Sequence, residues 1–197
     1  MSRKSTSIRK KQILEASRGI IVKYGSENVT IRRIAKEVGI TEGAIYRHFK
    51  SKKEVLFGMA DFAVNSLLDD ISIIDSSVDD KLEVVSLTLS RHLTEIEQRK
   101  GATFQVIAEI ISFGDKKLNK RVYEGLNQYI EKLRDVLRIY AKSNKNFNNK
   151  DIDAASFILF GMIQGLVNIW ALSNYDFDLK QKYLRMWDIF RRDILSR

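Results

Sequence analysis

The sequence predicts an all-α protein, and three observations support this fold class. The 197 residues contain no proline, so the residue that most often interrupts a helix is absent throughout. Apolar residues recur at spacings of three to five along the chain, as they do on one face of a helix. Strict alternation of apolar and polar residues, which marks a half-buried strand, is not found. We expect about nine helices.

The first quarter of the chain contains three predicted helices separated by glycines. The first covers 7–24, and Gly25 ends it because glycine adopts the left-handed conformation that closes many helices. Thr30 is placed to cap a second, short helix that ends at Gly39. Thr41 is placed to cap the third in the same way, since a threonine hydroxyl accepts a hydrogen bond from the backbone one turn on.

The remaining sequence is predicted to be helical with short polar connections. Ser51 begins the fourth helix, and Glu54 three residues later completes a capping box. Asp79 and Asp178 are candidate N-caps of two later helices. These helices are expected near 52–74, 79–99, 102–114, 116–142, 150–173 and 178–195, with polar loops at 143–149 and 173–177.

The net charge of +9 lies entirely in the first 56 residues. This segment has 14 lysines and arginines against five acids, whereas the other 141 residues contain 20 of each sign. A basic unit joined to a neutral one indicates that the first meets a polyanion and the second does something else. Charge alone leaves nucleic acid, a membrane surface and an ordinary solvated surface open.

Two short helices joined around Gly39 form a candidate helix-turn-helix. Ala35 is small where the two helices would cross, and Ile40 and Ile45 face the core. The other positions of the second helix then form a surface that fits the DNA major groove. Small residues there let the backbone approach the bases, while hydroxyl, imidazole and guanidinium groups donate hydrogen bonds. This predicted reading surface consists of Thr41, Glu42, Gly43, Ala44, Tyr46, Arg47 and His48.

Residues 30–56, TIRRIAKEVGITEGAIYRHFKSKKEVL, resemble the DNA-binding signature of the TetR (tetracycline-repressor) family. Residues 13–17 (ILEAS) and the pair Tyr24–Gly25 are similar to the family's first helix. Lys53 stands where the family often has an acid. The positions that match the signature are Thr30, Ile34, Ala35, Gly39, Ile40, Thr41, Gly43, Tyr46, His48, Phe49, Lys52 and Leu56.

The resemblance implies a dimeric transcriptional regulator, usually a repressor. It implies an N-terminal three-helix DNA-binding domain (1–51) and a helical C-terminal domain (52–197) for effector binding and dimerisation. A small-molecule effector would then release the dimer from a pseudo-palindromic double-stranded DNA operator. By the family pattern, Thr30, Thr41, Tyr46 and Lys52 contact phosphates, residues 42–44 and 46–48 read bases, and the arm from Arg3 to Lys11 adds phosphate or minor-groove contacts.

The stretch 154–172, AASFILFGMIQGLVNIWAL, contains no charged residue. Its length suffices for a membrane span, but Gln164 and Asn168 lie at its middle, which favours a helix buried against a partner. Small residues allow the close approach of a second helix, and the last helix adds an apolar stripe. We expect no membrane span. The expected homodimer interface consists of Ala154, Phe157, Gly161, Gln164, Gly165, Asn168, Tyr183, Met186, Trp187 and Phe190.

The helices of 52–173 are expected to enclose an effector pocket. An apolar lining suits a small apolar or amphipathic effector, although plain core packing is the alternative for each residue. His92 is expected to lie at the surface or to be half-buried. With two histidines and no cysteine, we expect no metal and no other cofactor. The candidate lining residues are Phe62, His92, Phe104, Phe113, Tyr123, Tyr129 and Trp170.

Other functional classes have less support in the sequence. An enzyme is not expected, because there is no Walker loop, no GxSxG motif and no metal-ligand spacing. A non-specific architectural nucleic-acid-binding protein is the alternative, which the charge allows although no aromatic wedge or stacking platform is found. The basic N-terminus lacks the apolar core of a signal peptide, so we expect a cytoplasmic protein. No motif specifies the operator sequence or the effector.

Overall fold

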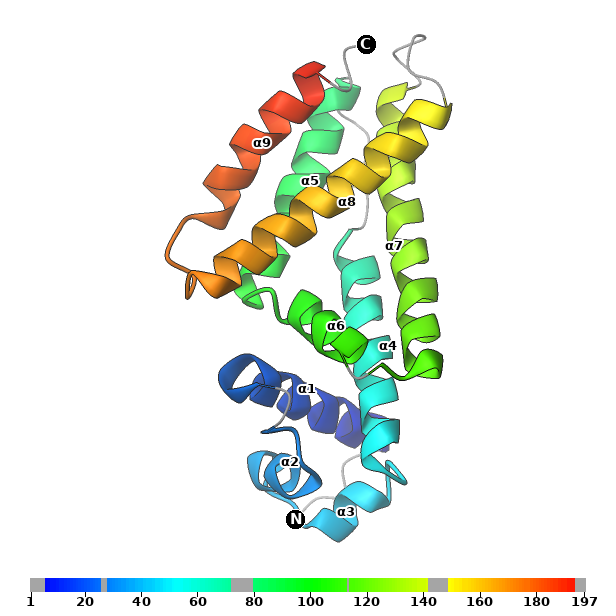
Figure 1. Ribbon diagram of the computed structural model, residues 1–197, viewed down its shortest axis with the longest axis vertical. Helices are drawn as coiled ribbons and strands as arrows, with labels where there is room; N and C mark the ends of the chain where they lie inside the picture. The colour runs from blue at the N-terminus through cyan, green and yellow to red at the C-terminus, as the bar shows by residue number, and fades with distance from the viewer. Residues whose placement is uncertain (1–5, 26–27, 72–79, 113, 142–148, 194–197) are drawn as a thin grey trace. The chain divides into compact units, whose positions relative to one another are not determined.

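The computed structural model is all-α, as the sequence predicts (Figure 1). It describes residues 6–25, 28–71, 80–112, 114–141 and 149–193. Within these ranges there is no strand, and the helices lie close to their expected bounds. They are α1 (Thr6–Tyr24), α2 (Ile31–Val38), α3 (Glu42–Tyr46), α4 (Lys52–Asp70), α5 (Lys81–Gln98), α6 (Ala102–Ser112), α7 (Lys116–Ala141), α8 (Asn149–Leu172) and α9 (Leu179–Asp193).

The chain divides into two compact units that do not follow chain order. Unit 1 combines residues 1–64 with 102–123, and unit 2 combines 65–101 with 124–197. Unit 1 therefore contains α1, α2, α3 and α6, and unit 2 contains α5, α8 and α9, while α4 and α7 contribute residues to both. These units are defined by contacts within the chain and not by function, so the predicted functional boundary after residue 51 stays a prediction.

Unit 1 is built around the buried face of α1. Ile13 and Ile20 of this helix are almost fully buried, and both α2 and α6 pack against it. Gly58 of α4 marks another close approach, since a Cβ there would lie 3.0 Å from Leu14 Cδ2 and 3.1 Å from Phe49 Cε1. Phe49 is itself buried. The residues around the first helix thus form one small core beneath the helix-turn-helix.

Threonine caps begin α2 and α3 where the sequence predicts them. The Thr30 hydroxyl accepts a hydrogen bond from the Arg33 N–H at 3.1 Å. The Thr41 hydroxyl accepts one from the Ala44 N–H at 3.2 Å. Each bond satisfies a backbone donor that the helix itself leaves without a partner, so both helix starts are fixed by residues close in sequence.

A capping box begins α4. Ser51 Oγ accepts from the Glu54 N–H at 3.2 Å, and Glu54 Oε2 accepts from the Lys50 N–H at 2.6 Å. The glutamate therefore reaches the residue before the N-cap. The predicted capping box is confirmed, with its second bond shifted by one residue.

Aspartates begin two helices of unit 2. Asp178 Oδ1 accepts from the Gln181 N–H at 2.7 Å, which confirms its predicted role as the N-cap of α9. At α5 the capping carboxylate is that of Asp80, which accepts from the Glu83 N–H at 3.3 Å. Asp79, the predicted cap, lies outside the described residues, as does most of the predicted loop at 143–149.

Unit 2 contains α5 and α8 packed against α9, and Figure 1 shows α8 and α9 side by side. The chain between α5 and α6 makes a close contact within this unit. Gly101 has a left-handed φ of +63°, and a Cβ there would lie only 2.5 Å from Val167 Cγ1. Both the backbone conformation and the neighbouring valine therefore require glycine at this position.

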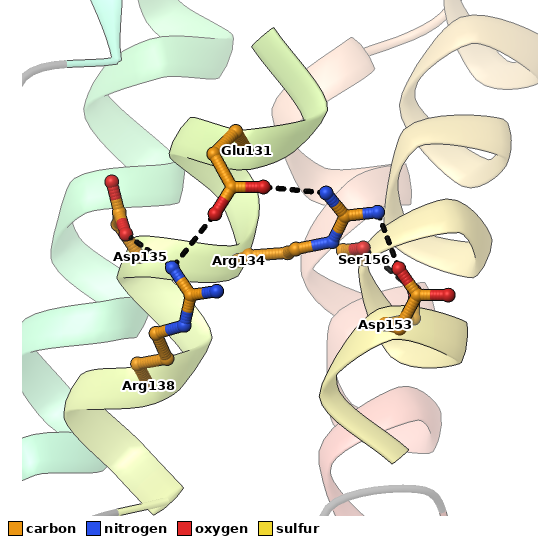
Figure 2. Close-up of polar contacts among 6 residues, drawn as sticks. All are labelled: Glu131, Arg134, Asp135, Arg138, Asp153 and Ser156. Carbon is orange, nitrogen blue, oxygen red and sulfur yellow. Dashed lines mark hydrogen bonds and ion pairs between the residues drawn. The ribbon is translucent and has the colours of Figure 1, made fainter. Parts of the chain in front are cut away.

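An ion-pair network on unit 2 joins α7 to α8 (Figure 2). Arg134 of α7 pairs with Glu131 of its own helix at 2.5 Å and with Asp153 of α8. Arg138 extends the network to Glu131 and Asp135, at 2.8 and 2.7 Å. The Arg134 side chain is 22% exposed and its partners more so, and pairs this accessible to water contribute about 0–1 kcal/mol each. The network therefore links the two helices but adds little to the stability that the core supplies.

One helical segment of the described chain, Asp151–Leu172, is long and apolar enough to cross a membrane by length and composition. One face of it is buried within the chain, including Ala155, Leu159 and Ile163. A core helix of a soluble protein passes the same test. Its apolar character is therefore weak support for a membrane span.

Candidate nucleic-acid interface and effector site

Two backbone hydrogen bonds close the turn between α2 and α3. Gly39 has a left-handed φ of +70°, which costs glycine little because it has no Cβ. Its N–H donates to the Lys36 carbonyl at 3.2 Å, and the Ile40 N–H donates to the Ala35 carbonyl at 2.9 Å. These are the bonds of a Schellman motif. The backbone of the turn thus sets the direction in which α3 leaves α2.

The reading helix α3 is anchored by one residue and exposes most of the others. Ile45 is completely buried. Glu42, Gly43 and Arg47 are exposed, and Tyr46 is 50% exposed. The nearest described heavy atom to a Cβ at Gly43 would be 4.0 Å away, so the backbone there is open to an approaching molecule. A bare backbone flanked by hydrogen-bond donors is what a helix in the major groove requires.

His48 follows α3 and lies half-buried among basic residues. Burial lowers the pKa of His48, and the charges of Arg9, Lys10 and Arg47 lower this pKa further. Its Nδ1 is buried without a hydrogen-bond partner among the described residues. The protonated form of His48 is therefore disfavoured in the free protein. A phosphate placed beside it would favour the protonated form.

Part of the predicted basic arm belongs to α1. Arg3 and Lys4 lie outside the described residues, whereas residues 9–11 are helical. Lys10 Nζ lies 5.5 Å from the centre of the Phe49 ring. Basic side chains of the first helix thus lie beside the end of the helix-turn-helix, where a polyanion would be attracted.

The start of α4 carries one exposed lysine and one paired lysine. Lys52 is exposed. Lys53 Nζ lies 2.5 Å from Asp115 Oδ2, and this contact, followed by the Leu118 N–H, lowers the pKa of Asp115. Lys53, which departs from the TetR-family pattern, is thus engaged within unit 1. Lys52 is better placed to meet a phosphate at this helix N-terminus.

All nine predicted DNA contacts lie in the described chain, on α3 and around the starts of α2 and α4. Seven are exposed and two, Ala44 and His48, are half-buried. Their contacts with DNA stay predictions. The nine are Thr30, Thr41, Glu42, Gly43, Ala44, Tyr46, Arg47, His48 and Lys52.

The predicted effector residues are divided between the two units, so they do not form one pocket within either unit. Tyr123 is 65% exposed, which does not suit a residue that lines a buried pocket. Unit 1 contains Phe62, Phe104 and Tyr123, and unit 2 contains His92, Tyr129 and Trp170. Phe113 lies outside the described residues.

Two of these residues meet in the core of unit 2. His92 Nε2 and Tyr129 Oη are 2.7 Å apart, and both side chains are completely buried. The prediction that His92 lies at the surface or half-buried is wrong. One turn away on either side, Thr88 and Ile96 are also buried, so His92 belongs to the inner face of α5.

Tyr183 of α9 is another buried polar side chain of unit 2, although it was predicted to face a partner subunit. Its side chain is 1% exposed, and its hydroxyl has no hydrogen-bond partner among the described residues. Burial raises the pKa of Tyr129, and Tyr183 and Asp70 act in the same direction. We call His92, Tyr129 and Tyr183 the polar centre.

Trp170 has contacts of its own at the end of α8. Its Nε1 donates to the Phe177 carbonyl at 2.9 Å. Its ring meets that of Tyr175 edge-on, with centres 4.8 Å apart. These contacts join α8 to the turn before α9, so a structural role accounts for this tryptophan.

The predicted partner surface of α8 is exposed in the single chain. A Cβ on Gly161 or Gly165 would meet no described heavy atom within 4 Å. Large apolar side chains beside them are also exposed, with Ile169 at 59% and Leu172 at 79%. Of the six predicted interface positions on α8, Gln164 is half-buried and the other five are exposed. The exposed ones are Ala154, Phe157, Gly161, Gly165 and Asn168.

On α9 the exposed apolar face differs from the predicted one. Tyr183, Trp187 and Phe190 are buried within the chain, so the prediction that they face a partner is corrected. Leu184 and Ile189 are exposed instead. Both faces of this helix carry apolar residues at helical spacing, and the pattern alone does not say which one faces inward.

A shallow apolar groove with a volume of about 330 Å³ runs between α8 and α9. It continues the exposed apolar face of both helices, and it includes the predicted residue Met186, which is half-buried. The groove is lined by Ile158, Met162, Met186, Ile189, Phe190 and Asp193.

Two family models match the chain. One, described as bacterial regulatory proteins of the tetR family, matches residues 13–59. The other, described as the C-terminal region of YsiA-like protein, matches residues 59–190. The first contains the whole helix-turn-helix, and the second covers more than half of the chain.

Curated relatives and solved structures are similar over nearly the whole chain. The nucleoid occlusion factor SlmA of Vibrio vulnificus is 26% identical over 199 residues, covering 98% of this chain and 100% of that protein. The structure of FadR from Bacillus subtilis in complex with stearoyl-CoA has a TM-score of 0.73 at 21% identity and covers 91% and 96% of the two chains. FadR from Bacillus halodurans has a TM-score of 0.73 at 20% identity and covers 96% of each. The two structures show the fold.

Proposed function

Because the chain belongs to the TetR family of bacterial regulatory proteins, we propose that it is a repressor released from DNA by a small-molecule effector. It is a DNA-binding transcriptional regulator by family. The proposal adds that it acts in the cytoplasm as a homodimer on a pseudo-palindromic operator. The observation that carries the effector part is the polar centre, which keeps two buried polar atoms without partners among the described residues, a rare condition in folded proteins.

The DNA-binding step is supported by the exposed face of α3. Tyr46 and Arg47 project from a helix whose start and direction are fixed by Thr41 and Gly39. Arg47 has the donor geometry to bind guanine or phosphate, and Tyr46 can donate to a phosphate. A two-fold dimer of such helices reads two half-sites about one helical turn or more apart.

The homodimer is supported by the exposed apolar face of α8 and α9. Ile169 and Leu172 are largely exposed in the single chain, and a single chain has little reason to keep such side chains in water. Gly161 and Gly165 lie on this face with open space above them. A second copy could therefore approach closely there, and the same surface would serve both copies of a two-fold dimer.

The effector is proposed to be an acyl compound that is apolar along most of its length. The FadR structure, which is similar over nearly the whole chain, is a complex with stearoyl-CoA. The core of unit 2 combines apolar side chains with the neutral groups of the polar centre. An amphipathic molecule matches such a mixture.

Fluorescence anisotropy on a duplex taken from upstream of the protein's own gene tests the regulator. A random duplex of equal length serves as the control at three salt concentrations. We expect a preference of roughly a thousandfold for the upstream duplex, abolished by Tyr46→Ala, and partial release of the protein by stearoyl-CoA. Equal affinity for both duplexes that is unchanged in Tyr46→Ala would instead support non-specific architectural binding.

Light scattering on two matched glycine variants tests the dimer surface. Gly165→Arg places a charge on the exposed face of α8 and should yield a monomer. Gly19→Arg alters another helical glycine with no described heavy atom near its Cβ position, and it should remain a dimer. A dimeric Gly165→Arg protein would contradict the proposed interface.

A second candidate function comes from the curated relatives, of which the nucleoid occlusion factor SlmA of Vibrio vulnificus is similar over 98% of this chain. Loss of a nucleoid occlusion factor should change where division septa form, whereas loss of a repressor need not. We would therefore image division septa and nucleoids in a strain that lacks the gene. Septa over nucleoids would favour this second function, and normal septa with one derepressed operon would favour the repressor.

A further inference from the structure

One ion pair of unit 1 joins the start of α4 to the start of α7. Lys53 Nζ of α4 lies 2.5 Å from Oδ2 of Asp115, the residue just before α7. Both residues belong to unit 1, although they are 62 positions apart in the sequence. The same ammonium lies 6.0 Å from the centre of the Phe57 ring. The Lys53 side chain is therefore drawn toward α7 by groups of the protein itself.

The two carboxylate oxygens of Asp115 have separate roles. Oδ1 accepts from the Lys117 N–H at 3.1 Å and from the Leu118 N–H at 3.0 Å, which caps the start of α7. Oδ2 is the oxygen that contacts Lys53. The contact with Lys53, followed by the Leu118 N–H, lowers the pKa of Asp115, so this carboxylate is charged near pH 7. An asparagine at this position would keep the cap and lose the ion pair.

A second ion pair joins the same two helices further along. Arg121 of α7 donates to both carboxylate oxygens of Asp61 of α4, from Nε to Oδ1 and from Nη2 to Oδ2, the latter at 2.7 Å. This pair lies about two turns beyond the first on each helix. Because Asp61 and Arg121 also belong to unit 1, α4 and α7 stay joined when the pair between Lys53 and Asp115 opens.

The start of α4 lies in the basic part of the chain. Lys52, the neighbour of Lys53, is exposed and is the predicted phosphate contact. Arg47 and Lys50 in the preceding segment are exposed as well. Consecutive helical residues point about 100° apart, so Lys52 and Lys53 point in different directions. A lysine has a flexible four-carbon stem, and the Lys53 ammonium can therefore leave Asp115 and turn toward this basic surface.

We propose that Lys53 is a latent phosphate-binding residue for DNA, which Asp115 withholds by binding its ammonium as a phosphate would. Exposed ion pairs are weak, so the pair can open without a change of fold. Opening it adds one cation to the DNA-binding surface. Asp115, which lies outside the helix-turn-helix, thus lowers the affinity for DNA. This inference rests on the proposed function, because it requires that the start of α4 meets DNA phosphates.

Salt titrations of DNA affinity test this inference with Asp115→Asn. The full-length protein is titrated onto the random duplex by fluorescence anisotropy, because phosphate contacts carry no sequence information. We expect binding about threefold tighter than wild type, the equivalent of one exposed ion pair. The slope of log K against log salt should steepen by about 0.9 for each subunit bound, which marks one further neutralised phosphate. The melting temperature should stay near the wild-type value, because Asn caps a helix as well as Asp does.

Two variants separate this contact from a change in overall charge. The double variant Lys53→Gln/Asp115→Asn has the net charge of the wild type and lacks the latent cation, so its affinity and slope should return to wild-type values. Asp61→Asn also removes one acid of unit 1, but the arginine that it releases lies about two turns further along the helices. It should cause a smaller gain in affinity and no change in slope.

Four results would overturn the inference. They are no gain in affinity for Asp115→Asn, a gain without a steeper slope, a gain that persists in the double variant, and an equal gain for Asp61→Asn.

Lys52→Gln distinguishes failure of this inference from failure of the predicted DNA contact. It should flatten the slope by about 0.9 for each subunit bound, because it removes one phosphate contact. A flattened slope together with no effect of Asp115→Asn would leave the contact of α4 in place and contradict only the role of Lys53. An unchanged slope in Lys52→Gln would contradict the contact of α4 with DNA, and the inference would fail with it.

Discussion

The hydrogen bonds that shape the DNA-reading region join residues close in sequence, whereas those in the core of unit 2 join residues far apart. Thr41 accepts from the residue three positions on, and Gly39 closes its helix within the same few residues. His92 and Tyr129 are 37 positions apart, and Arg99 and Asp70 are 29 apart. The reading region is thus set locally and exposed, while the polar centre depends on the whole bundle.

Two glycines with left-handed backbones, one from each unit, give the largest expected contrast. Gly101→Ala should destabilise the protein by about 2–5 kcal/mol, because the strained backbone conformation and the collision with Val167 act together. Gly114 has a similar φ of +66° but no described heavy atom within 4 Å of its Cβ position. Gly114→Ala should therefore cost only about 1–2 kcal/mol. Equal losses in denaturant unfolding would contradict the close contact.

A pH titration of stability should distinguish the buried histidine from the surface groups. The pKa of His92 is about 3 in the folded protein and near 6.5 when unfolded, so the unfolded chain binds the extra proton first. The free energy of unfolding should therefore fall as pH decreases below 6.5, by about 1.4 kcal/mol between pH 7.5 and 5.5.

Two variants, one for each histidine, serve as controls for this titration. His92→Gln should remove most of the slope between pH 7.5 and 5.5. His48→Gln should retain most of it, because His48 is only half-buried. A slope that survives in His92→Gln would show that another group is responsible.

Loss of a local cap should have a smaller and pH-independent effect. Thr41→Ala removes the acceptor for the Ala44 N–H and should cost about 1 kcal/mol of stability. Thr41→Ser keeps a hydroxyl at the cap and should stay within a few tenths of the wild-type value. Chemical denaturation of the three proteins checks this order.

The exposed network between α7 and α8 should matter least. Asp153→Asn removes the charge that Arg134 reaches across the two helices, and the loss should be below about 0.5 kcal/mol because Arg134 keeps Glu131 as a partner. Asp188→Asn, which affects a pair within α9, is the matched comparison. A loss above 1 kcal/mol only for Asp153→Asn would show that the network, and not the core, positions the two helices.

The same contrast explains what the sequence could and could not predict. Helix starts at Thr30, Thr41 and Asp178 were predictable, because a cap and its backbone donor lie within one turn. The class of fold followed from the absence of proline and the helical spacing. The contact between His92 and Tyr129 was not predictable, since two helices far apart in sequence must pack before these side chains meet.

The faces of α9 show the limit in another way. Tyr183 and Trp187 look like a partner surface in the sequence because they are large, apolar and regularly spaced. Ile189, which is 56% exposed, follows an equally acceptable spacing. Only packing against α5 and α8 decides which stripe is buried, and the spacing of apolar residues in one sequence does not predict which stripe that is.

The turn at Gly39 also has a consequence for the order of events during synthesis. Its bonds, and the caps on either side, all join residues between Thr30 and Ala44. They can form soon after that segment leaves the ribosome, because short loops close fastest. The polar centre must wait until Tyr183 has been translated. A nascent chain can therefore form the helix-turn-helix before unit 2 is complete.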